Sequence, residues 1–235
     1  MSAKRKAARQ ERFSNVVNVD FEKKKEVKIL PRSIHQEDYV LKLLDPEKSI
    51  VFGIGPAGTG KTMLAVLAGV KKFKDGNVDK IIITRPAVNA DEDLGFLPGT
   101  LEEKMAPWTR PMFDVLRDYF TARDLQSMIE EGVLEIAPLA YMRGRTFKDS
   151  FIIADEMQNA TPSQMKMLLT RIGENSEMAV TGDLAQADRQ ADNGLIDFIT
   201  LLNRRNTNYI DIVKFTDNDI ERHQAVKEVL NIYGD

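Results

Sequence analysis

Short apolar runs alternate with helix-like patterns from about residue 33 onward. Five runs are the best strand candidates, at residues 51–54, 81–84, 151–154, 178–181 and 210–213. The first three are almost continuously apolar, which is typical of central strands that helices cover on both faces of a sheet. Strands that alternate with helices in this way predict an α/β fold of βαβ units around a mainly parallel sheet.

Two segments carry clear helix signals. In residues 161–173, Thr161 is a good N-cap, Pro162 suits the first helical position, and Gly173 is a good terminator. The apolar residues of this segment recur at helical spacing: Met165, Leu168, Leu169 and Ile172. We expect this stripe to face the core, although a binding face would show the same pattern. A short helix is also expected at residues 38–44, before the first strand.

The composition excludes several kinds of site. The chain of 235 residues has 43% hydrophobic and 29% charged residues, no cysteine and two histidines. Disulfides, cysteine-ligated zinc, iron–sulfur clusters, thiol catalysis and a three-histidine metal site are therefore excluded. No apolar run approaches the roughly 18 to 20 residues of a membrane span, and residues 1–6 precede no hydrophobic signal core. We expect a cytoplasmic protein without a membrane partner.

The net charge of −3 is unevenly distributed. Residues 1–32 carry ten Lys/Arg against four Asp/Glu, whereas the rest of the chain carries 23 against 32. We therefore divide the chain into a basic N-terminal extension, residues 1–32, and one domain, residues 33–235. Such a basic extension can bind along a nucleic-acid backbone. The alternative is a solvated chain terminus, which has the same composition.

The segment after the first predicted strand fits the phosphate-binding pattern G-x-x-x-x-G-K-[ST] and leads into a helix at Met63. Its residues are Gly55, Pro56, Ala57, Gly58, Thr59, Gly60, Lys61 and Thr62. The glycines allow backbone N–H groups to point at phosphate oxygens, and the helix adds its positive N-terminal end. Lys61 can then reach the β and γ phosphates of ATP, and the Thr62 hydroxyl can ligate Mg²⁺. The alternative is an ordinary glycine-rich turn with a surface lysine.

Two carboxylates, Asp155 and Glu156, follow the third predicted strand. Ligands of open α/β sheets bind at this end of the strands, so Asp155 is the expected partner of Mg²⁺ together with Thr62. Glu156 can polarise the water that attacks the γ phosphate. The alternative is an acidic pair that starts a surface helix.

Residues 155–158 and 182–186 resemble the D-E-x-Q and G-D-x-x-Q motifs of superfamily 1 helicases. This resemblance assigns Gln158 and Gln186 to the γ phosphate and to the loops that respond to its loss. Gln36 is similar in placement to the glutamine that reads adenine in those ATPases, and a solvated surface glutamine is the alternative.

The chain as a whole resembles the PhoH family of phosphate-starvation-inducible ATP-binding proteins of bacteria and bacteriophages, over roughly residues 30–232. The motifs that carry this resemblance are the phosphate-binding loop and residues 83–88, 94–99, 140–146 and 153–159. The resemblance implies a three-layer P-loop ATPase with a RecA-like, superfamily 1 helicase-like core, located in the cytoplasm, or in the host cytoplasm for a phage member. Some relatives add a PIN or a KH domain; neither fits in this sequence, so RNA cleavage is not carried over.

A superfamily 1 helicase closes its nucleotide site with an arginine from a second RecA-like domain, and the sequence holds one such core. An arginine of this kind increases the rate of nucleotide hydrolysis roughly 10³- to 10⁵-fold. We therefore expect a homo-oligomer, with a hexameric ring as the favoured form, in which each subunit supplies an arginine to its neighbour. Arg222 is the first candidate, with Arg143 and Arg145 next. Alternatively, Arg222 pairs with Asp219 on a helix, and residues 143–145 form a loop that contacts phosphate or nucleic acid within one subunit.

Residues 86–131 form a longer connection than one βα unit needs, and they include Trp108, the only tryptophan. This segment also contains an apolar series with the spacing of one helix face: Met112, Val115, Leu116, Tyr119 and Phe120. Core packing is the favoured interpretation. The alternative is a subunit contact or the lip of a central pore, where Arg85 and residues 89–99 meet a nucleic-acid strand.

The leading functional hypothesis is ATP hydrolysis, with ATP and Mg²⁺ bound, coupled to RNA or another single-stranded nucleic acid. A nucleotide-dependent switch or scaffold of the phosphate-stress response, without unwinding, is the alternative. A small-molecule kinase would use the same loop, but the acidic pair and the glutamine motifs position water rather than an acceptor hydroxyl.

Overall fold

The computed structural model describes residues 26–86, 101–187, 192–221 and 224–233. The strands are β1 (Ile50–Ile54), β2 (Lys80–Arg85), β3 (Leu134–Pro138), β4 (Ser150–Ala154), β5 (Glu177–Gly182) and β6 (Ile210–Lys214). The α-helices are α2 (Ile34–Leu44), α3 (Lys61–Lys74), α4 (Leu101–Arg117), α5 (Ala122–Glu130), α6 (Pro162–Leu169), α7 (Gly194–Leu202) and α8 (Gln224–Tyr233). Four 3₁₀ segments are η1 (Leu139–Met142), η2 (Met157–Asn159), η3 (Leu184–Gln186) and η4 (Asp217–Asp219).

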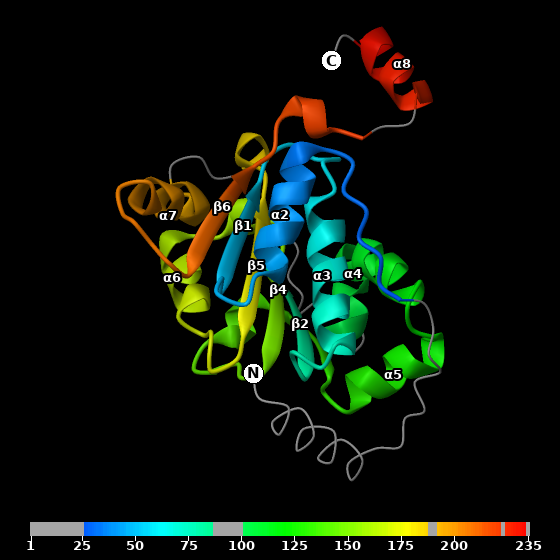
Figure 1. Cartoon of the computed structure of the whole chain (residues 1–235), viewed down its shortest axis with the longest axis vertical. Coiled ribbons are helices and arrows are strands. Elements are labelled where there is room, and N and C mark those ends of the chain that lie inside the picture. The colour runs from blue at the N-terminus through cyan, green and yellow to red at the C-terminus, as the bar shows by residue number, and fades with distance from the viewer. Residues whose placement is uncertain (1–25, 87–100, 188–191, 222–223, 234–235) are drawn as a thin grey trace.

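The six strands form one parallel sheet with the order β3-β2-β4-β5-β1-β6. Helices α2, α3, α4 and α5 lie on one face of this sheet, and α6 and α7 lie on the other (Figure 1). The predicted α/β fold with helices on both faces is confirmed. Because all strands run the same way, the loops that follow β1, β4 and β5 meet at one edge of the sheet.

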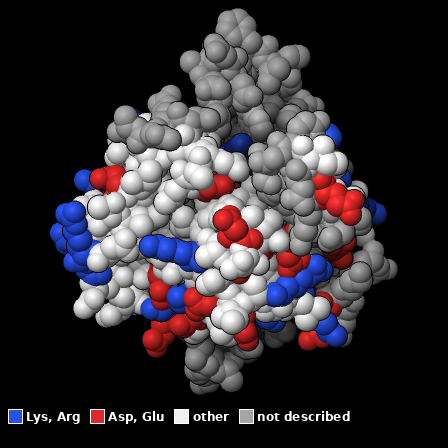
Figure 2. All heavy atoms as spheres, turned by 90° about the horizontal axis from the view of Figure 1, so that it is seen from above, with Lys and Arg blue, Asp and Glu red and all other residues white. Residues whose placement is uncertain are grey.

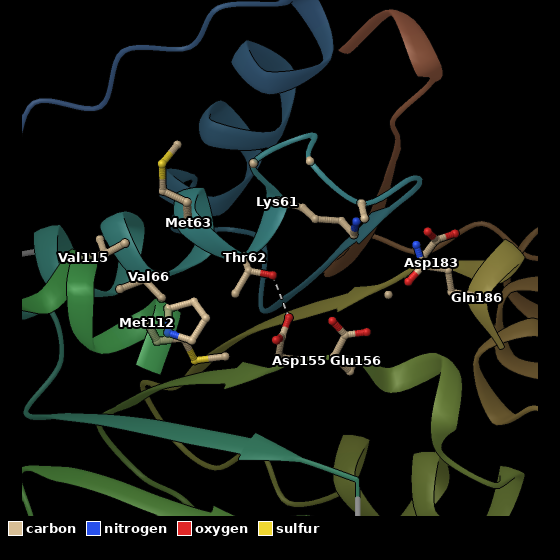
Figure 3. A pocket seen from close by; sticks show the side chains of 15 residues that line it. Lys61, Thr62, Met63, Val66, Met112, Val115, Asp155, Glu156, Asp183 and Gln186 are labelled. Carbon is tan, nitrogen blue, oxygen red and sulfur yellow. Dashed lines mark hydrogen bonds between the residues drawn. The ribbon is translucent and has the colours of Figure 1, made fainter. Parts of the chain in front are cut away.

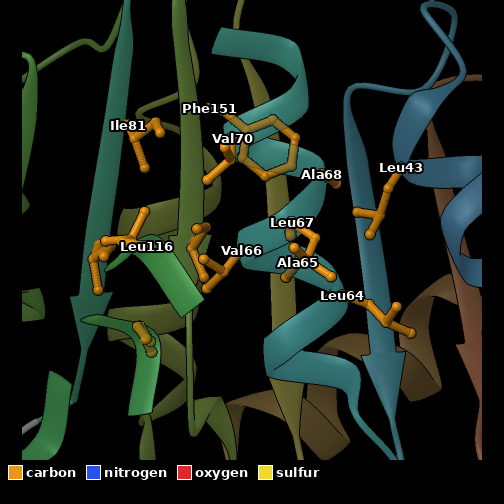
Figure 4. Close-up of a cluster of buried hydrophobic side chains, with 14 of the residues drawn as sticks. Leu43, Leu64, Ala65, Val66, Leu67, Ala68, Val70, Ile81, Leu116 and Phe151 are labelled. Atoms are coloured by element: carbon orange, nitrogen blue, oxygen red, sulfur yellow. The ribbon is translucent and has the colours of Figure 1, made fainter. Parts of the chain in front are cut away.

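Two apolar cores, one on each face, hold the layers together. In the first, α3 places Val66 and Val70 near Phe151 of β4, with Leu116 of α4 nearby (Figure 4). Gly69 lets α3 approach the sheet closely, because a Cβ atom there would lie 2.9 Å from the Phe151 ring. This packing fixes the first turn of α3, and with it the phosphate-binding loop, relative to the end of β4.

All five predicted strands are present, and each is one or two residues longer than predicted. Sequence analysis missed β3, which is buried at every residue except Glu135 and ends at Pro138. This strand lies at the sheet edge and pairs with β2. Edge strands tolerate proline, and Pro138 together with the charged Glu135 interrupts the apolar pattern that identifies the other strands.

The predicted helix at residues 161–173 is too long at its C-terminal end, because α6 ends at Leu169. Ile172 instead pairs with Phe147 in a parallel bridge. At the N-terminal end, Thr161 is the N-cap as predicted and forms a capping box with Gln164. The stripe residues Met165 and Leu168 are buried in the core, as expected.

Two other helix boundaries differ from the pattern. Helix α2 begins at Ile34, earlier than predicted, because the Ser33 side chain accepts a hydrogen bond from the Gln36 N–H. Helix α4 ends at Arg117, so Tyr119 and Phe120 lie beyond it. Core packing of the apolar series is confirmed for its members with the least exposure: Met112, Leu116 and Phe120.

The N-terminal boundary remains a prediction, although Val27 of the predicted extension is buried in the first core. Within the described ranges, no helix combines the length and the apolar character that crossing a membrane requires. The predicted nucleic-acid loop at residues 89–99 lies outside the described residues.

Candidate functional site

A cavity of about 290 Å³ opens where the phosphate-binding loop faces the ends of β4 and β5 (Figure 3). Its polar side holds Lys61, Thr62, Asp155, Glu156 and Asp183, and its apolar side lies along α3 and α4. The lining residues are Ala57, Gly58, Gly60, Lys61, Thr62, Met63, Val66, Pro111, Met112, Val115, Asp155, Glu156, Gly182, Asp183 and Gln186. The structure thus brings together the loop and the acidic strand end that sequence analysis singled out.

The loop has the backbone conformation that phosphate binding needs. Gly58 and Gly60 have φ values of 83° and 77°, in the left-handed region that favours glycine. No side chain caps the N-terminus of α3 at Gly60, so its first N–H groups are available to an anion. Of the predicted loop residues, Gly55, Pro56 and Thr59 do not line the cavity; the Thr59 hydroxyl donates to the Pro56 carbonyl oxygen at 2.9 Å.

The ammonium group of Lys61 lies against its own loop. Its Nζ donates a hydrogen bond to the Pro56 carbonyl oxygen at 2.8 Å. Burial lowers the pKa of Lys61, and the negative charges of Asp183, Glu156 and Asp155 partly oppose this shift. The three carboxylates therefore favour the charged lysine, which has to leave the Pro56 carbonyl to reach a phosphate.

Thr62 and Asp155 form the expected pair of oxygen donors. The Thr62 hydroxyl donates to Asp155 Oδ1 at 2.7 Å, and the Thr181 hydroxyl donates to the same oxygen. The Asp155 N–H donates to the Thr84 carbonyl oxygen at 3.0 Å, which fixes the backbone at the end of β4. A hydroxyl and a carboxylate fit Mg²⁺, which takes oxygen ligands, keeps several waters and needs few protein groups.

Glu156 lines the cavity in a strained backbone conformation. Its φ is 54° and its ψ is 37°, in the left-handed region that is rare for residues other than glycine, asparagine and aspartate. Such strain occurs where the surrounding structure holds a functional side chain in place. The Glu156 carboxylate accepts a hydrogen bond from the Gln158 side chain.

Gln158 connects two parts of the site. It is buried, its Oε1 accepts a hydrogen bond from the Asp183 N–H at 3.1 Å, and its backbone oxygen accepts one from Asn193 at 2.7 Å. Gln158 does not line the cavity, whereas Gln186 does. The structure therefore places Gln186 at the cavity and Gln158 next to Glu156, outside the cavity lining.

Gln36, the predicted adenine-reading residue, lies beside the phosphate-binding loop. Its side chain is buried; Nε2 donates to the Thr59 carbonyl oxygen at 3.1 Å, and Oε1 accepts from the Arg32 N–H at 2.8 Å. It is not a solvated surface residue, and both ends of its amide contact backbone groups rather than the cavity.

Of the candidate arginines, Arg143 and Arg145 do not line the cavity. The guanidinium of Arg145 is paired with both oxygens of Glu135, which raises the pKa of Arg145, and it lies 4.6 Å from the Phe147 ring centroid. Arg143 is exposed, and Arg222 lies outside the described residues. Asp219, its predicted alternative partner, lies in η4.

Sequence analysis did not assign roles to three parts of the site. Asp183 lies within the G-D-x-x-Q motif, which could have indicated it. Thr181 precedes that motif, and only the sheet register brings it to Asp155. The apolar wall of Pro111, Met112 and Val115 carries no motif, because its place depends on how α4 packs.

The comparisons with known proteins identify the family of the chain. Residues 28–234 match the family described as PhoH, PhoH-like protein. The chain is 46% identical to a PhoH-like protein of Bacillus subtilis over 204 residues, which are 86% of this chain and 63% of that protein. It is 43% identical to Protein PhoH of Escherichia coli (strain K12) over 210 residues, 88% of this chain and 58% of that protein.

The chain thus spans less than two thirds of the length of these relatives. Among solved structures, Pif1 helicase from Candida albicans is similar with a TM-score of 0.40 and 15% identity, over 88% of this chain and 44% of that one. The family match covers nearly all of the sequence, including every element that builds the cavity. The chain belongs to the PhoH family.

Proposed function

We propose that this protein binds ATP with Mg²⁺ in the cavity and hydrolyses it. The observation that carries the proposal is the hydrogen bond between Thr62 and Asp155, beside Lys61 and Glu156 in one cavity. A glycine-rich loop, a lysine, a hydroxyl and two carboxylates are the groups that nucleoside triphosphate hydrolysis uses.

Each group has a distinct task. The loop N–H groups and Lys61 hold the phosphates, and Thr62 and Asp155 would hold Mg²⁺. The ion would neutralise charge on the phosphate oxygens. Glu156 orients the attacking water and accepts its proton, and Gln158 keeps the Glu156 carboxylate in place. Gln186 reaches the end of the triphosphate from η3, the segment that follows β5.

The variant Glu156→Gln tests this assignment. It keeps the shape of the side chain and removes the base, so MgATP binding should persist while hydrolysis falls at least about a hundredfold. Glu174→Gln, at an exposed position away from the cavity, is the matched control and should hydrolyse ATP like the unchanged protein. Turnover in Glu156→Gln at the unchanged rate would contradict the role of Glu156.

We also propose that the active form is a homo-oligomeric ring, with six subunits favoured. No arginine lines the cavity in the described part of the chain, and the Arg145 guanidinium is paired with Glu135. An arginine supplied by a neighbouring copy, with Arg222 as first candidate, would complete the site. Mixing Lys61→Ala subunits with Arg222→Ala subunits should restore part of the ATPase activity that each lacks alone. If mixed assemblies of confirmed size show no ATPase activity, this result would contradict the proposal that neighbouring subunits share an active site.

We propose that ATP hydrolysis is coupled to the binding or unwinding of RNA or another single-stranded nucleic acid, in the cytoplasm. The basic composition of residues 1–32 supports this. Over the described surface at the carboxyl edge of the sheet, acidic and basic side chains are intermingled (Figure 2), so the proposal does not rest on a basic patch there.

The second candidate is a nucleotide-dependent switch or scaffold, and the mixed charges on this edge favour it. The ATPase rate with and without single-stranded RNA at low salt separates the two functions. Stimulation that disappears when residues 1–25 are removed supports nucleic-acid coupling; Val27 and Arg32 are kept because they contact the folded domain. An unchanged rate supports the switch.

A further inference from the structure

The outer side of the phosphate-binding loop is held by two segments that lie far apart in the sequence. Gln36 Nε2 of α2 donates to the Thr59 carbonyl oxygen, and the Glu221 N–H, beyond β6, donates to the Gly58 carbonyl oxygen, both at 3.1 Å. Neither Gln36 nor Glu221 lines the cavity. In Figure 3, α2 and the segment after β6 lie across the loop from Asp155 and Glu156.

These outer contacts determine where the inner donors point. In a planar trans peptide, the carbonyl group and the following N–H group point in opposite directions. Holding the Gly58 and Thr59 carbonyl groups from outside therefore directs the N–H groups of Thr59 and Gly60 away from the outer segments. Successive N–H groups that point into one concavity are what binds phosphate oxygens.

The two outer segments are joined through Asp219. Its side chain is 3% exposed. Its Oδ2 atom lies 2.8 Å from His35 Nδ1 and accepts from the Thr216 N–H at 2.7 Å, and its Oδ1 atom lies 3.0 Å from the same His35 nitrogen. His35 precedes Gln36 in α2, and Asp219 lies two residues before Glu221. One buried carboxylate thus connects the parts of the chain that hold the Thr59 and Gly58 carbonyl groups.

We propose that Asp219 is a positioning residue for phosphate recognition: through His35 and Thr216 it keeps Gln36 and Glu221 on the outer carbonyl groups of the loop. This inference rests on the proposed function, because it assumes that the loop binds the phosphates of a nucleotide. It adds a role for a carboxylate outside the cavity that touches neither ligand nor metal.

The first experiment measures dissociation constants for MgATP and for magnesium tripolyphosphate, which has no base. Asp219→Asn removes the charge with little change in shape, and we expect both ligands to bind about tenfold more weakly, by the same factor. A loss of affinity for MgATP alone would contradict the proposal, because it would place the effect of Asp219 at the adenine base. Asp217→Asn, on the exposed surface of the same 3₁₀ segment, is the matched control and should bind both ligands within twofold of the unchanged protein.

A second pair of variants tests the backbone contact itself. Glu221→Pro removes the N–H that bonds to Gly58, and the preceding Ile220 already has φ −72° and ψ 115°, which proline allows. Glu221→Ala keeps this N–H and removes the carboxylate that pairs with Arg32. The proline variant should lose affinity for tripolyphosphate about as much as Asp219→Asn, and clearly more than the alanine variant, which keeps the N–H.

Thermal melting shows whether each variant is folded at the assay temperature. If Asp219→Asn is unfolded, the comparison of the two Glu221 variants tests the proposal in its place. Folded Asp219→Asn that binds tripolyphosphate as tightly as the unchanged protein would overturn the proposal. Equal affinities of the two Glu221 variants would also overturn it. If the unchanged protein binds neither ligand, the proposed function itself fails, which is a different result.

Discussion

The Thr62 hydroxyl donates a hydrogen bond of 2.7 Å to the Asp155 carboxylate, across 93 positions of the sequence. Thr62 belongs to the first turn of α3, and Asp155 directly follows β4. The packing of α3 on the sheet sets this distance, so the phosphate loop and the acidic strand end are parts of one site. We propose that these two oxygens share the magnesium ion of a bound nucleotide.

The first prediction concerns this pair. Thr62→Ala removes one oxygen donor and should weaken ATP binding about tenfold or more in the presence of Mg²⁺. Binding in excess chelator should change little, because the hydroxyl acts through the ion. Thr62→Ser keeps the hydroxyl and is the control for the lost methyl group. Titration with a fluorescent ATP analogue measures all of these affinities. An equal loss with and without magnesium would argue against the metal role.

The second prediction concerns the start of the loop. Gly55 has φ 152°, and a Cβ atom there would lie 2.6 Å from the Phe215 carbonyl oxygen. Gly55→Ala should therefore lower the free energy of unfolding by about 2 to 4 kcal/mol. Gly76→Ala, at φ 69° with nothing within 4 Å of the added Cβ, should lower it by only about 1 kcal/mol. Urea denaturation of both variants makes the comparison, and similar losses would contradict the close contact with Phe215.

The third prediction is a pH dependence. Burial by itself would raise the pKa of Asp219, but hydrogen bonds from Ser33, Thr216 and His35 outweigh it and lower the pKa to about 2. Because the folded pKa lies below the unfolded value of about 3.9, the stabilisation is complete above about pH 5 and is lost as the pH falls through 4 toward 2.

Urea denaturation at pH 6 should show Asp219→Asn less stable than the unchanged protein by about 2 kcal/mol. At pH 3 and below the difference should shrink. A difference that grows as the pH falls would contradict the lowered pKa.

The fourth prediction separates two neighbouring arginines. Arg145→Ala removes the paired contact with Glu135 and the contact with the Phe147 ring, and should lower the free energy of unfolding by about 1 kcal/mol. Arg143→Ala, at an exposed position, should leave stability unchanged. If Arg143 instead meets nucleic acid, its loss will reduce RNA stimulation alone. Calorimetric melting and the ATPase assay together distinguish these effects.

The sequence predicts those parts of the site that depend on local structure. The loop after β1 could be recognised because its glycines supply left-handed backbone conformations at fixed positions, between a buried strand and a helix. Asp155 and Glu156 could be placed for the same reason, since they directly follow a buried strand. These signals are contained in a few consecutive residues.

The remaining features depend on contacts between distant segments. The contact of Asp219 with His35 joins the two ends of the domain, and the link from Gln158 to Asp183 depends on the order of β4 and β5 in the sheet. The edge strand β3 and the early end of α6 also escaped prediction, because pairing partners decide them rather than local propensity. The wall that α4 adds to the cavity belongs to the same class.

The most direct test of the account is isothermal titration calorimetry of the purified protein with ATP and Mg²⁺. The account predicts binding of a single nucleotide per chain and the loss of most of this affinity in Lys61→Ala, which should remain folded. The absence of nucleotide binding by the unchanged protein, or equal binding by Lys61→Ala, would contradict the central claim that this loop holds the triphosphate.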